Sequence, residues 1–389
     1  MNIPQWPEAL ESVHKLAKVD NKREATASDS MPSSTYILRH TEQARTIPAA
    51  GEPPRTIRLI LGALAMKPPL TRMLLQATAM AIGLTLAAAT AASPAKIFYL
   101  TPDLNFSFWH NIAQGVAAEA KKSGFELQVL SSHDDGAIQL QNARQAIAAG
   151  ATGIVLSPTD SSTAPAVLAL AEQANVPVVI ADVGTNSGTY VSFISSDNHT
   201  GAYQTGQALL SALRQKGWNG GDIASITLSL ARNNGRLRSA GFAQALTEAG
   251  AQLSDSREMK SYTADESTQF TRDLLSKHTQ LRGLFVQADI PTLGAVQAIR
   301  TANRGQSLAL AAFDGTPEFI DLIRRGDVLV SGMQQPYLMG QRAGEALILH
   351  LAKKPVAPAI NIPILIVTHQ NIDELLPILR ETVFANEIR

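Results

Sequence analysis

The sequence predicts an α/β protein with two similar lobes, each built on a parallel central sheet. From Lys96 onward, short apolar runs typical of buried strands alternate with amphipathic stretches typical of helices. The alternation pauses near residues 195–198 and then starts again, which predicts the second lobe. Several apolar runs also end in an aspartate, and in open α/β sheets ligands bind beyond the carboxyl ends of the strands. These acidic side chains would together form a polar site for a small molecule.

The first lobe is expected to be a series of βαβ units, because strand-like runs alternate with helical runs through its first four strands. Its predicted strands are 96–100, 126–130, 153–157, 177–181 and 191–194, and its predicted helices are 108–123, 138–149 and 163–174.

The second lobe repeats this order after a helix predicted over 201–215. Its predicted strands are 223–228, 258–262, 283–287, 307–313 and 328–332, and its predicted helices are 236–249, 267–277, 291–303 and 317–324. A helix over 337–352 and a strand over 361–367 come after this lobe is complete. If they return to the first lobe, the chain crosses between the lobes several times and the cleft can close as a hinge.

The junction after the strand 307–313 shows how such a site could be built. Asp314 ends the apolar run, Thr316 is expected to cap the next helix, and Pro317 suits its first position. Asp103 and Asp182 follow apolar runs in the same way. For each aspartate alone, capping of the next helix or a turn is an equally good interpretation.

Composition excludes several classes of protein. The 389 residues carry no formal net charge, and no basic stripe or helix-turn-helix pattern points to nucleic acid. The absence of cysteine removes disulfides, thiolate metal sites and cysteine nucleophiles. No motif for a cofactor or a phosphate is present, and the histidines lack metal-binding spacing. The sequence therefore predicts no cofactor and no metal.

Residues 66–92 have the features of a secretory signal peptide. Met66, Lys67 and Arg72 form a positive start, the stretch 73–89 contains no charge, and small residues follow it. A single membrane anchor is the alternative, although the run is close to the minimum spanning length. A bacterial periplasmic location is expected. Residues 1–65 are polar and rich in Pro, Ser and Thr, so translation could start at Met66 or Met73, with the preceding segment a gene-start artefact or a disordered extension.

The order of short motifs along about 290 residues resembles the ribose/galactose-type periplasmic solute-binding proteins that serve ABC importers. Each motif is weak alone, and the joint order behind a signal peptide is specific. The motifs are Asn105-x-x-Phe108-Trp109, Ser157-Pro158-Thr159-Asp160-Ser161, Asn175-Val176-Pro177-Val178-Val179, Ser196-Asp197-Asn198, Gly235-Arg236-x-Arg238-x-x-Gly241-Phe242, Phe313-Asp314-Gly315-Thr316-Pro317 and Gln334.

This resemblance implies two Rossmann-like lobes joined by a multi-strand hinge, with the ligand in the cleft between them. The implied organisation is an N-terminal lobe over 93–197 and 335–364 and a C-terminal lobe over 198–334 and 365–389. The implied partners are a sugar or polyol and a membrane permease, and a monomer is expected.

The resemblance also implies roles for particular side chains. Phe108 and Trp109 match rings that stack on the apolar face of a sugar. Arg236 matches the sugar-binding arginine, whose planar fork can donate to two hydroxyls. Arg238, two positions further along the helix, is expected at the surface or at a lobe contact. Asp182 and Asp314 match acceptor carboxylates, and Gln334 matches an amide near the hinge.

Four positions depart from the ribose-binding pattern. Val183 stands where that pattern has a second arginine, Ala288 and Phe106 each replace an asparagine, and Asp103 adds a carboxylate to the first loop. Ribose itself is therefore not the favoured ligand. Asp289 follows Ala288 and is equally suited to binding ligand or capping the next helix.

The expected site has more acceptors than donors. Asp103, Asp182, Asp314 and Asp289 face Arg236 alone, so an anionic sugar acid would be repelled and a neutral sugar, polyol or similar hydroxylated molecule is favoured. A cation enclosed by Phe106, Phe108 and Trp109 is a less favoured option.

Two other functions remain open from the sequence. Paired carboxylates beside His110 could serve an enzyme as general acid and base, but no nucleophile, zinc or phosphate motif accompanies them. An extracytoplasmic sensor of the same fold, signalling to a membrane receptor, would use the same lobe closure. We favour a substrate-binding protein over both.

Overall fold

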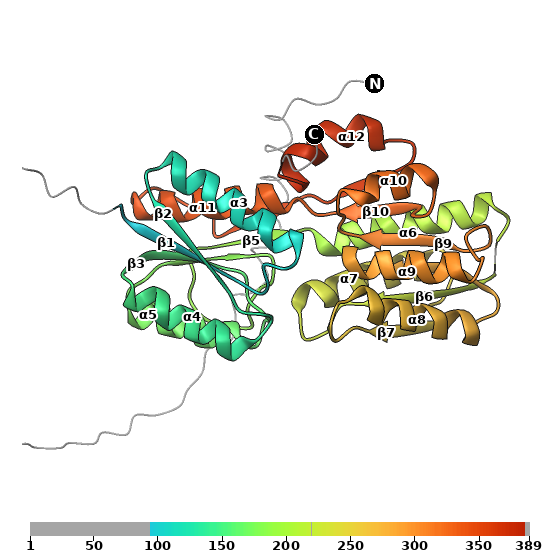
Figure 1. Ribbon diagram of the computed structural model, residues 1–389, viewed down its shortest axis with the longest axis horizontal. Helices are drawn as coiled ribbons and strands as arrows, with labels where there is room; N and C mark the ends of the chain where they lie inside the picture. Colours follow the sequence, from blue (N-terminus) through green and yellow to red (C-terminus); the bar gives the residue numbers. More distant parts are fainter. Residues whose placement is uncertain (1–93, 219, 386–389) are drawn as a thin grey trace, which may run out of the picture. The chain divides into compact units, whose positions relative to one another are not determined.

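The computed structural model of the protein describes residues 94–218 and 220–385. The predicted N-terminal extension over 1–65 and the predicted signal peptide over 66–92 lie outside these residues. The predicted fold class is confirmed, since the chain forms two six-stranded sheets with helices packed on their faces (Figure 1).

The first sheet has the strand order β11-β5-β4-β3-β1-β2, and all its strand pairs are parallel. Right-handed βαβ crossovers put helices on the faces of such a sheet, and both faces must then be apolar. Its elements in chain order are β1 (Lys96–Thr101), α3 (Ser107–Lys122), β2 (Glu126–Ser131), α4 (Gly136–Ala148), β3 (Ala151–Leu156), α5 (Ala164–Gln173), β4 (Val178–Ala181) and β5 (Ser192–Ser196).

The second sheet repeats this arrangement with the order β12-β10-β9-β8-β6-β7. Its strand pairs are parallel except that β12 runs antiparallel to β10. Its elements in chain order are α6 (Asn198–Gln215), β6 (Asp222–Thr227), α7 (Asn233–Glu248), β7 (Asp255–Glu258), α8 (Ala264–Lys277), β8 (Leu281–Val286), α9 (Asp289–Thr301), β9 (Ala309–Phe313), α10 (Glu318–Arg325) and β10 (Val330–Met333).

The chain passes between the two sheets three times, after β5, after β10 and after β11. After β10 it enters α11 (Pro336–Leu351), which packs against α3, and then β11 (Ala359–Ile362) at the edge of the first sheet. It returns through β12 (Leu365–Thr368) and ends in α12 (Ile372–Ile378) and a π-helical turn over Leu379–Val383. The return of α11 and β11 to the first sheet agrees with the expectation for the late elements, whereas β12, at the end of the predicted strand 361–367, joins the second sheet.

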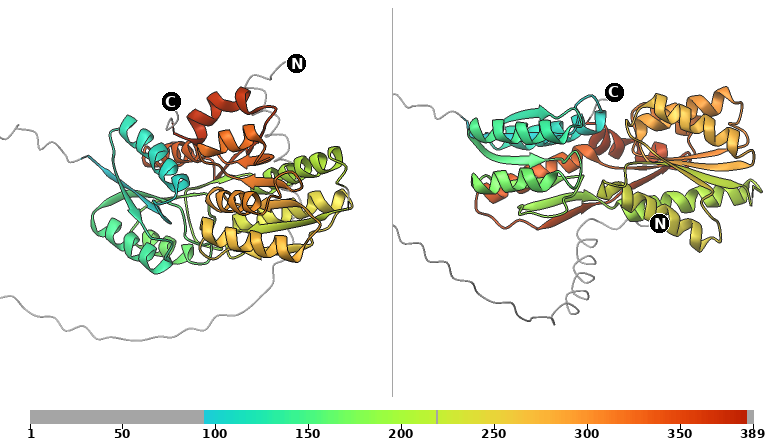
Figure 2. Two further views of the ribbon diagram at one scale, coloured as in Figure 1. Left: turned by 45° about the vertical axis from the view of Figure 1, so that its right-hand side comes forward. Right: turned by 90° about the horizontal axis from the view of Figure 1, so that it is seen from below.

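Alternating side chains of the central strands serve two separate cores in each lobe. Ile97 and Tyr99 of β1 pack with α3 and α11, whereas Phe98 and Leu100 pack with α4 and α5. Figure 2 shows helices on both faces of this sheet. The period of two along a strand causes this division.

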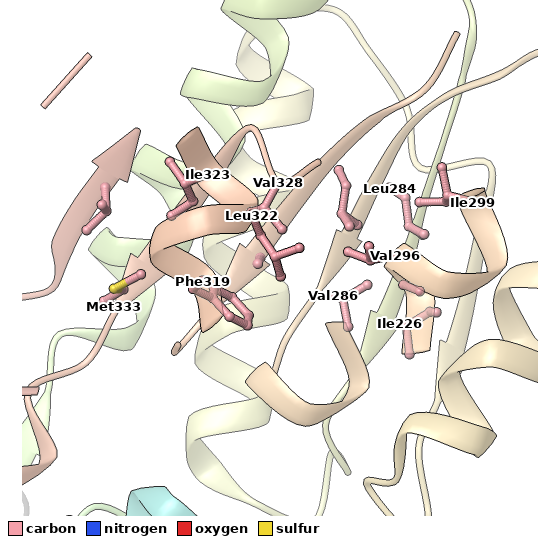
Figure 3. Close-up of a cluster of buried hydrophobic side chains, with 14 of the residues drawn as sticks. Ile226, Leu284, Val286, Val296, Ile299, Phe319, Leu322, Ile323, Val328 and Met333 are labelled. Atoms are coloured by element: carbon pink, nitrogen blue, oxygen red, sulfur yellow. The ribbon is translucent and has the colours of Figure 1, made fainter. Parts of the chain in front are cut away.

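The second lobe is organised in the same way. One core lies between its sheet and α6 and α7, and the other lies under α8, α9 and α10. In the latter, Val286 of β8 and Val296 of α9 pack near Phe319 of α10 (Figure 3). Both lobes are therefore closed three-layer units, and their strand ends can hold side chains in fixed positions.

Three details differ from the predictions. The strand predicted over 258–262 ends at Glu258, because the backbone N–H groups of Lys260, Ser261 and Tyr262 donate to the Glu266 carboxylate instead of to a neighbouring strand.

The strand predicted over 361–367 is two strands in different sheets, β11 and β12. Pro363 lies between them, and a proline has no N–H to donate to a strand pair.

Thr316 does not cap the helix that follows β9. The helix begins at Glu318 with Pro317 in the capping position, and the Thr316 hydroxyl has no hydrogen-bond partner among the described residues. The sequence prediction also missed α12 and the π-helical turn.

Within the described part of the chain, no helix combines the length and apolar character that crossing a bilayer requires.

Close contact between α3 and α11 depends on glycine. A Cβ atom on Gly340 of α11 would collide with the carbonyl oxygen of Ile112 in α3. We expect Gly340→Ala to lower the free energy of unfolding by about 1–3 kcal/mol, since backbone cannot move aside cheaply. Gly305→Ala is the control, because its new methyl group would meet open space. Urea denaturation should separate the two variants, and equal midpoints would contradict this account of the packing.

Candidate functional site

A cavity lies at the carboxyl ends of the strands, with residues of both lobes in its walls. This is the position in which open α/β sheets hold ligands. The first lobe contributes Asp103, Phe106, Phe108, Trp109, Asp134 and Asp182, and the second contributes Leu228, Arg232, Asn234, Arg238, Tyr262, Ala288, Asp289, Pro291 and Asp314, with Gln334 on the crossing after β10.

Asp182 and Asp314 occupy equivalent places in the two lobes. Asp182 directly follows β4 and Asp314 directly follows β9. Each has a left-handed backbone, with φ of 66° and 65°, and each donates its N–H to a carbonyl of the next strand at 2.9 Å. Aspartate tolerates this conformation better than most residues. The repeat of the fold thus brings one carboxylate from each lobe to the same cavity.

Arg238 is the central cation of the second lobe's wall. It is 1% exposed, and one guanidinium nitrogen lies 3.0 Å from Asp314 Oδ2. Its other bonds reach Asn198 Oδ1 at 2.8 Å and the carbonyl of Gln287 at 2.7 Å, and its guanidinium lies 4.0 Å from the centre of the Phe313 ring. A buried arginine with this many acceptors is held rigidly.

Burial controls the ionisation of the cavity carboxyls. It raises the pKa of Asp314, and Arg238 and Gln334 only partly oppose that rise. The pKa of Asp289 is raised by burial and by the adjacent Asp314. Two neighbouring carboxyls in a dry site do not readily ionise together. This pair therefore retains a proton more readily than exposed aspartates do.

Asp182 is the third buried carboxyl of the cavity. Burial raises its pKa from the ordinary value of 3.8 to about 6, and Arg238 opposes the rise. Its Oδ2 accepts a bond from Asn234 Nδ2 at 3.1 Å. Its Oδ1 is buried and has no partner among the described residues. An unpaired buried oxygen of this kind costs stability until something donates to it.

Gln334 presents a second unpaired acceptor. Its Nε2 donates to Asp314 Oδ1 at 2.6 Å, which fixes the orientation of the amide. Its Oε1 is buried without a partner in the described part of the chain. Two residues that line the cavity therefore each have an oxygen without a hydrogen-bond donor, a carboxylate oxygen on Asp182 and an amide oxygen on Gln334.

Aromatic side chains form an apolar part of the cavity. Phe108 and Trp109 pack edge to face, with ring centres 4.9 Å apart and planes at 87°. Both come from the first turn of α3, which follows the loop carrying Asp103 and Phe106. Such rings can cover the C–H face of a ligand while the opposite wall supplies hydrogen bonds.

All the predicted site residues except Arg236 line this cavity. Arg236 is exposed, and its guanidinium donates to the carbonyls of Leu230 and Ala231 and to Asn233 Oδ1. The expectation that Arg238 lies at the surface or a lobe contact is wrong. Because α7 begins at Asn233, Arg236 falls in its first turn and bends back toward the preceding loop, and Arg238 is the arginine of the cavity.

Sequence analysis missed Asp134, Arg232, Asn234 and Tyr262. Arg232 and Asn234 flank the start of α7 and match no motif in the resemblance. Tyr262 lies in a loop, at the end of the stretch 258–262 for which the sequence predicts a strand. Asp289 does not act as the N-cap of α9, since Ala288 holds that position, but its Oδ1 accepts the N–H of Ile290 at 2.8 Å.

The raised pKa of Asp182 predicts a pH dependence of stability. The Asp182 carboxyl loses its proton near pH 3.8 in the unfolded chain and near pH 6 in the folded protein. The free energy of unfolding therefore falls as the pH rises from 3.8 to about 6. The loss amounts to about 3 kcal/mol. We expect Asp182→Asn to remove this part of the fall, and Asp273→Asn, on the exposed face of α8, to retain it. Denaturation at pH 4 and pH 7 measures the difference, and superimposable profiles would contradict the assignment.

Comparison with known proteins connects this cavity to a family. A family model described as "Periplasmic binding protein domain" matches residues 97–355. The ribose import binding protein RbsB of Escherichia coli is 28% identical over 272 residues, which cover 69% of this chain and 88% of that protein. The D-apiose import binding protein of Paraburkholderia graminis is 28% identical over 265 residues, which cover 67% of this chain and 83% of that protein.

Solved structures show the same fold. A carbohydrate transporter solute-binding protein from Agrobacterium radiobacter, in complex with D-arabinose, has a TM-score of 0.68 at 21% identity and covers 75% of this chain and all of its own. The Caulobacter myo-inositol binding protein, bound to myo-inositol, has a TM-score of 0.67 at 20% identity, and the match covers 74% of this chain and 98% of that protein.

The family consists of binding proteins, so the protein is not an enzyme. The family resemblance in the motifs is confirmed by a match that spans both lobes. The chain belongs to the periplasmic binding protein family.

Proposed function

We propose that this protein captures a neutral sugar or polyol in the cavity between its lobes and delivers it to an ABC transporter permease. The observation that carries the proposal is the pair of unpaired buried acceptors, Asp182 Oδ1 and Gln334 Oε1, on residues that line the same cavity as the rings of Phe108 and Trp109. A hydroxylated ring supplies both hydroxyl donors and an apolar face. The relatives named for ribose, apiose, arabinose and inositol support the same ligand class.

The charges of the cavity favour a neutral ligand. Arg238 is paired with Asp314, and Arg232 is paired with Asp134. The remaining buried carboxyls, Asp182 and Asp289, have raised pKa values, which lowers their negative charge near neutral pH. Among the described residues that line the cavity, an anionic sugar acid would find no unpaired cation. Because the negative charge of the carboxyls is paired or reduced in this way, the site does not require a positively charged ligand to neutralise it.

Binding would work through closure of the lobes. Asp182 and the aromatic rings belong to the first lobe, whereas Arg238 and Asp314 belong to the second, with Gln334 on one of the crossings. A ligand can contact both groups only when the lobes meet, so it shifts the population toward the closed form. A permease would then recognise the closed surface.

The ligand class can be tested with a thermal-shift panel on the purified chain from residue 92 onward. Neutral sugars and polyols are compared with sugar acids and small cations. A ligand at about a hundred times its dissociation constant adds roughly 2.7 kcal/mol of stability. We expect stabilisation by neutral hydroxylated compounds, and response to acids or cations alone would overturn the proposal.

The same panel should include Asp182→Asn at pH 8, where the wild-type carboxylate is ionised. An amide in place of this acceptor leaves a ligand hydroxyl unpaired, which costs about 1–3 kcal/mol, so we expect Kd to rise about 5- to 150-fold. Asp273→Asn should bind as the wild type does.

The periplasmic location is also a proposal, and it rests on the signal-peptide pattern over residues 66–92 together with the family. We expect the native secreted protein to begin near residue 92. Intact mass of protein from an osmotic-shock fraction measures this directly. A native mass that includes residues 66–92 would favour the anchored or sensor alternative.

A further inference from the structure

A second hollow lies beside the ligand cavity and shares part of its wall. Asp134, Arg232 and Tyr262 line both spaces. The other sides of the second hollow come from both lobes, with Thr159 and Asp160 from the first and Lys260 from the second. These three shared residues therefore form a partition, and we call them the partition below.

The partition is held together by direct contacts. One guanidinium nitrogen of Arg232 lies 2.5 Å from Asp134 Oδ1, and the guanidinium carbon lies 4.6 Å from the centre of the Tyr262 ring. Arg232 is only 9% exposed. A planar guanidinium fixed by a carboxylate on one side and a ring on another has little freedom to move.

The partition also depends on lobe closure. Asp134 follows β2 in the first lobe, where its backbone has a left-handed φ of 57° and its N–H donates to the carbonyl of Pro102 at 2.9 Å. Arg232 directly precedes α7 in the second lobe. The next two residues contact the first lobe as well, Asn233 through Ser161 Oγ at 3.3 Å and Asn234 through Asp182 Oδ2 at 3.1 Å. The ion pair therefore forms only when the two lobes meet.

We propose that the Arg232–Asp134 pair, supported by Tyr262, is a length filter that restricts the ligand to a single sugar-sized unit. This inference rests on the proposed function and specifies its ligand class more closely. In the closed form a ligand confined to the main cavity leaves the pair intact. A substituent that extends toward the second hollow must separate Arg232 from Asp134, which leaves a partly buried charge on each side.

The filter acts through both size and charge. The arginine side chain occupies the path between the two spaces, and the energetic penalty for displacing it comes from the unpaired charges. Truncation of both partners removes the obstacle and the penalty together. Lys260 and Asp160 on the far side would then offer polar contacts to the added unit.

The test measures Kd by isothermal titration calorimetry for the wild type, Arg232→Ala and the double variant Arg232→Ala/Asp134→Ala. The double variant is included because Arg232→Ala alone leaves Asp134 partly buried without its partner. The probe sets are D-glucose with maltose and isomaltose, D-ribose with methyl β-D-ribofuranoside, and myo-inositol with galactinol. Arg272→Ala is the matched control, since Arg272 is exposed on α8 and lines neither space.

We expect the wild type to bind at least one unsubstituted probe and to bind its extended partner at least a hundredfold more weakly. Both Arg232 variants should reduce this ratio at least tenfold, and Arg272→Ala should leave it unchanged. A ratio that stays the same in both variants, or a wild type that binds the extended probe equally well, overturns the filter and leaves the proposed function intact. Failure of every probe to bind the wild type counts against the proposed function and removes the filter with it.

Discussion

The buried guanidinium of Arg238 organises the cavity wall of the second lobe. It joins the start of α6 through Asn198, the end of β8 through Gln287 and the end of β9 through Asp314. Three separate elements are thereby held at one point, and Gln334 is attached to the same carboxylate. Because two of these bonds are buried and the one to Asp314 is partly buried, loss of the arginine would leave acceptors from all three elements without this donor. The position of Asp314 in the cavity follows from this network.

Because the two lobes repeat the same fold, each lobe contributes one strand-end aspartate to the cavity. Both sheets are parallel over their central strands, and in each an aspartate with a left-handed backbone directly follows the fourth strand in chain order, β4 or β9. The two carboxylates have different partners, however. Asp314 accepts hydrogen bonds from Arg238 of its own lobe and from Gln334 on the crossing after β10. Asp182 accepts one from Asn234 of the opposite lobe. Closure therefore changes the surroundings of Asp182 more than those of Asp314.

The short segment 232–234 links the second lobe to the first, although no motif in its sequence indicates this role. Its three residues make ion-pair or hydrogen-bond contacts with Asp134, Ser161 and Asp182 of the first lobe. None of the three belongs to a motif, and only the start of α7 brings them to the first lobe. A function that depends on lobe closure can thus be adjusted at positions outside the recognised ligand motifs.

Much of the fold could be predicted because it depends on local patterns. Continuous apolar runs and amphipathic runs with a helical period identified nearly every strand and helix of both sheets, within a few residues. The exceptions have local causes that only neighbours reveal. The β7 strand ends early because Glu266 binds the N–H groups that follow it, and the last predicted strand divides at Pro363 because each part pairs with a different sheet.

By itself, the sequence determined the fold class, the strand-end aspartates and the aromatic pair at the start of α3. It could not distinguish Arg236 from Arg238, because the two residues are alike in type and two positions apart, and the difference between them is where α7 begins. The tertiary structure decided that Arg238 enters the cavity, and that Asp134, Arg232 and Tyr262 form one partition. Those residues are separated by tens of positions in the chain, and contacts across two lobes are set by packing, which no local pattern encodes.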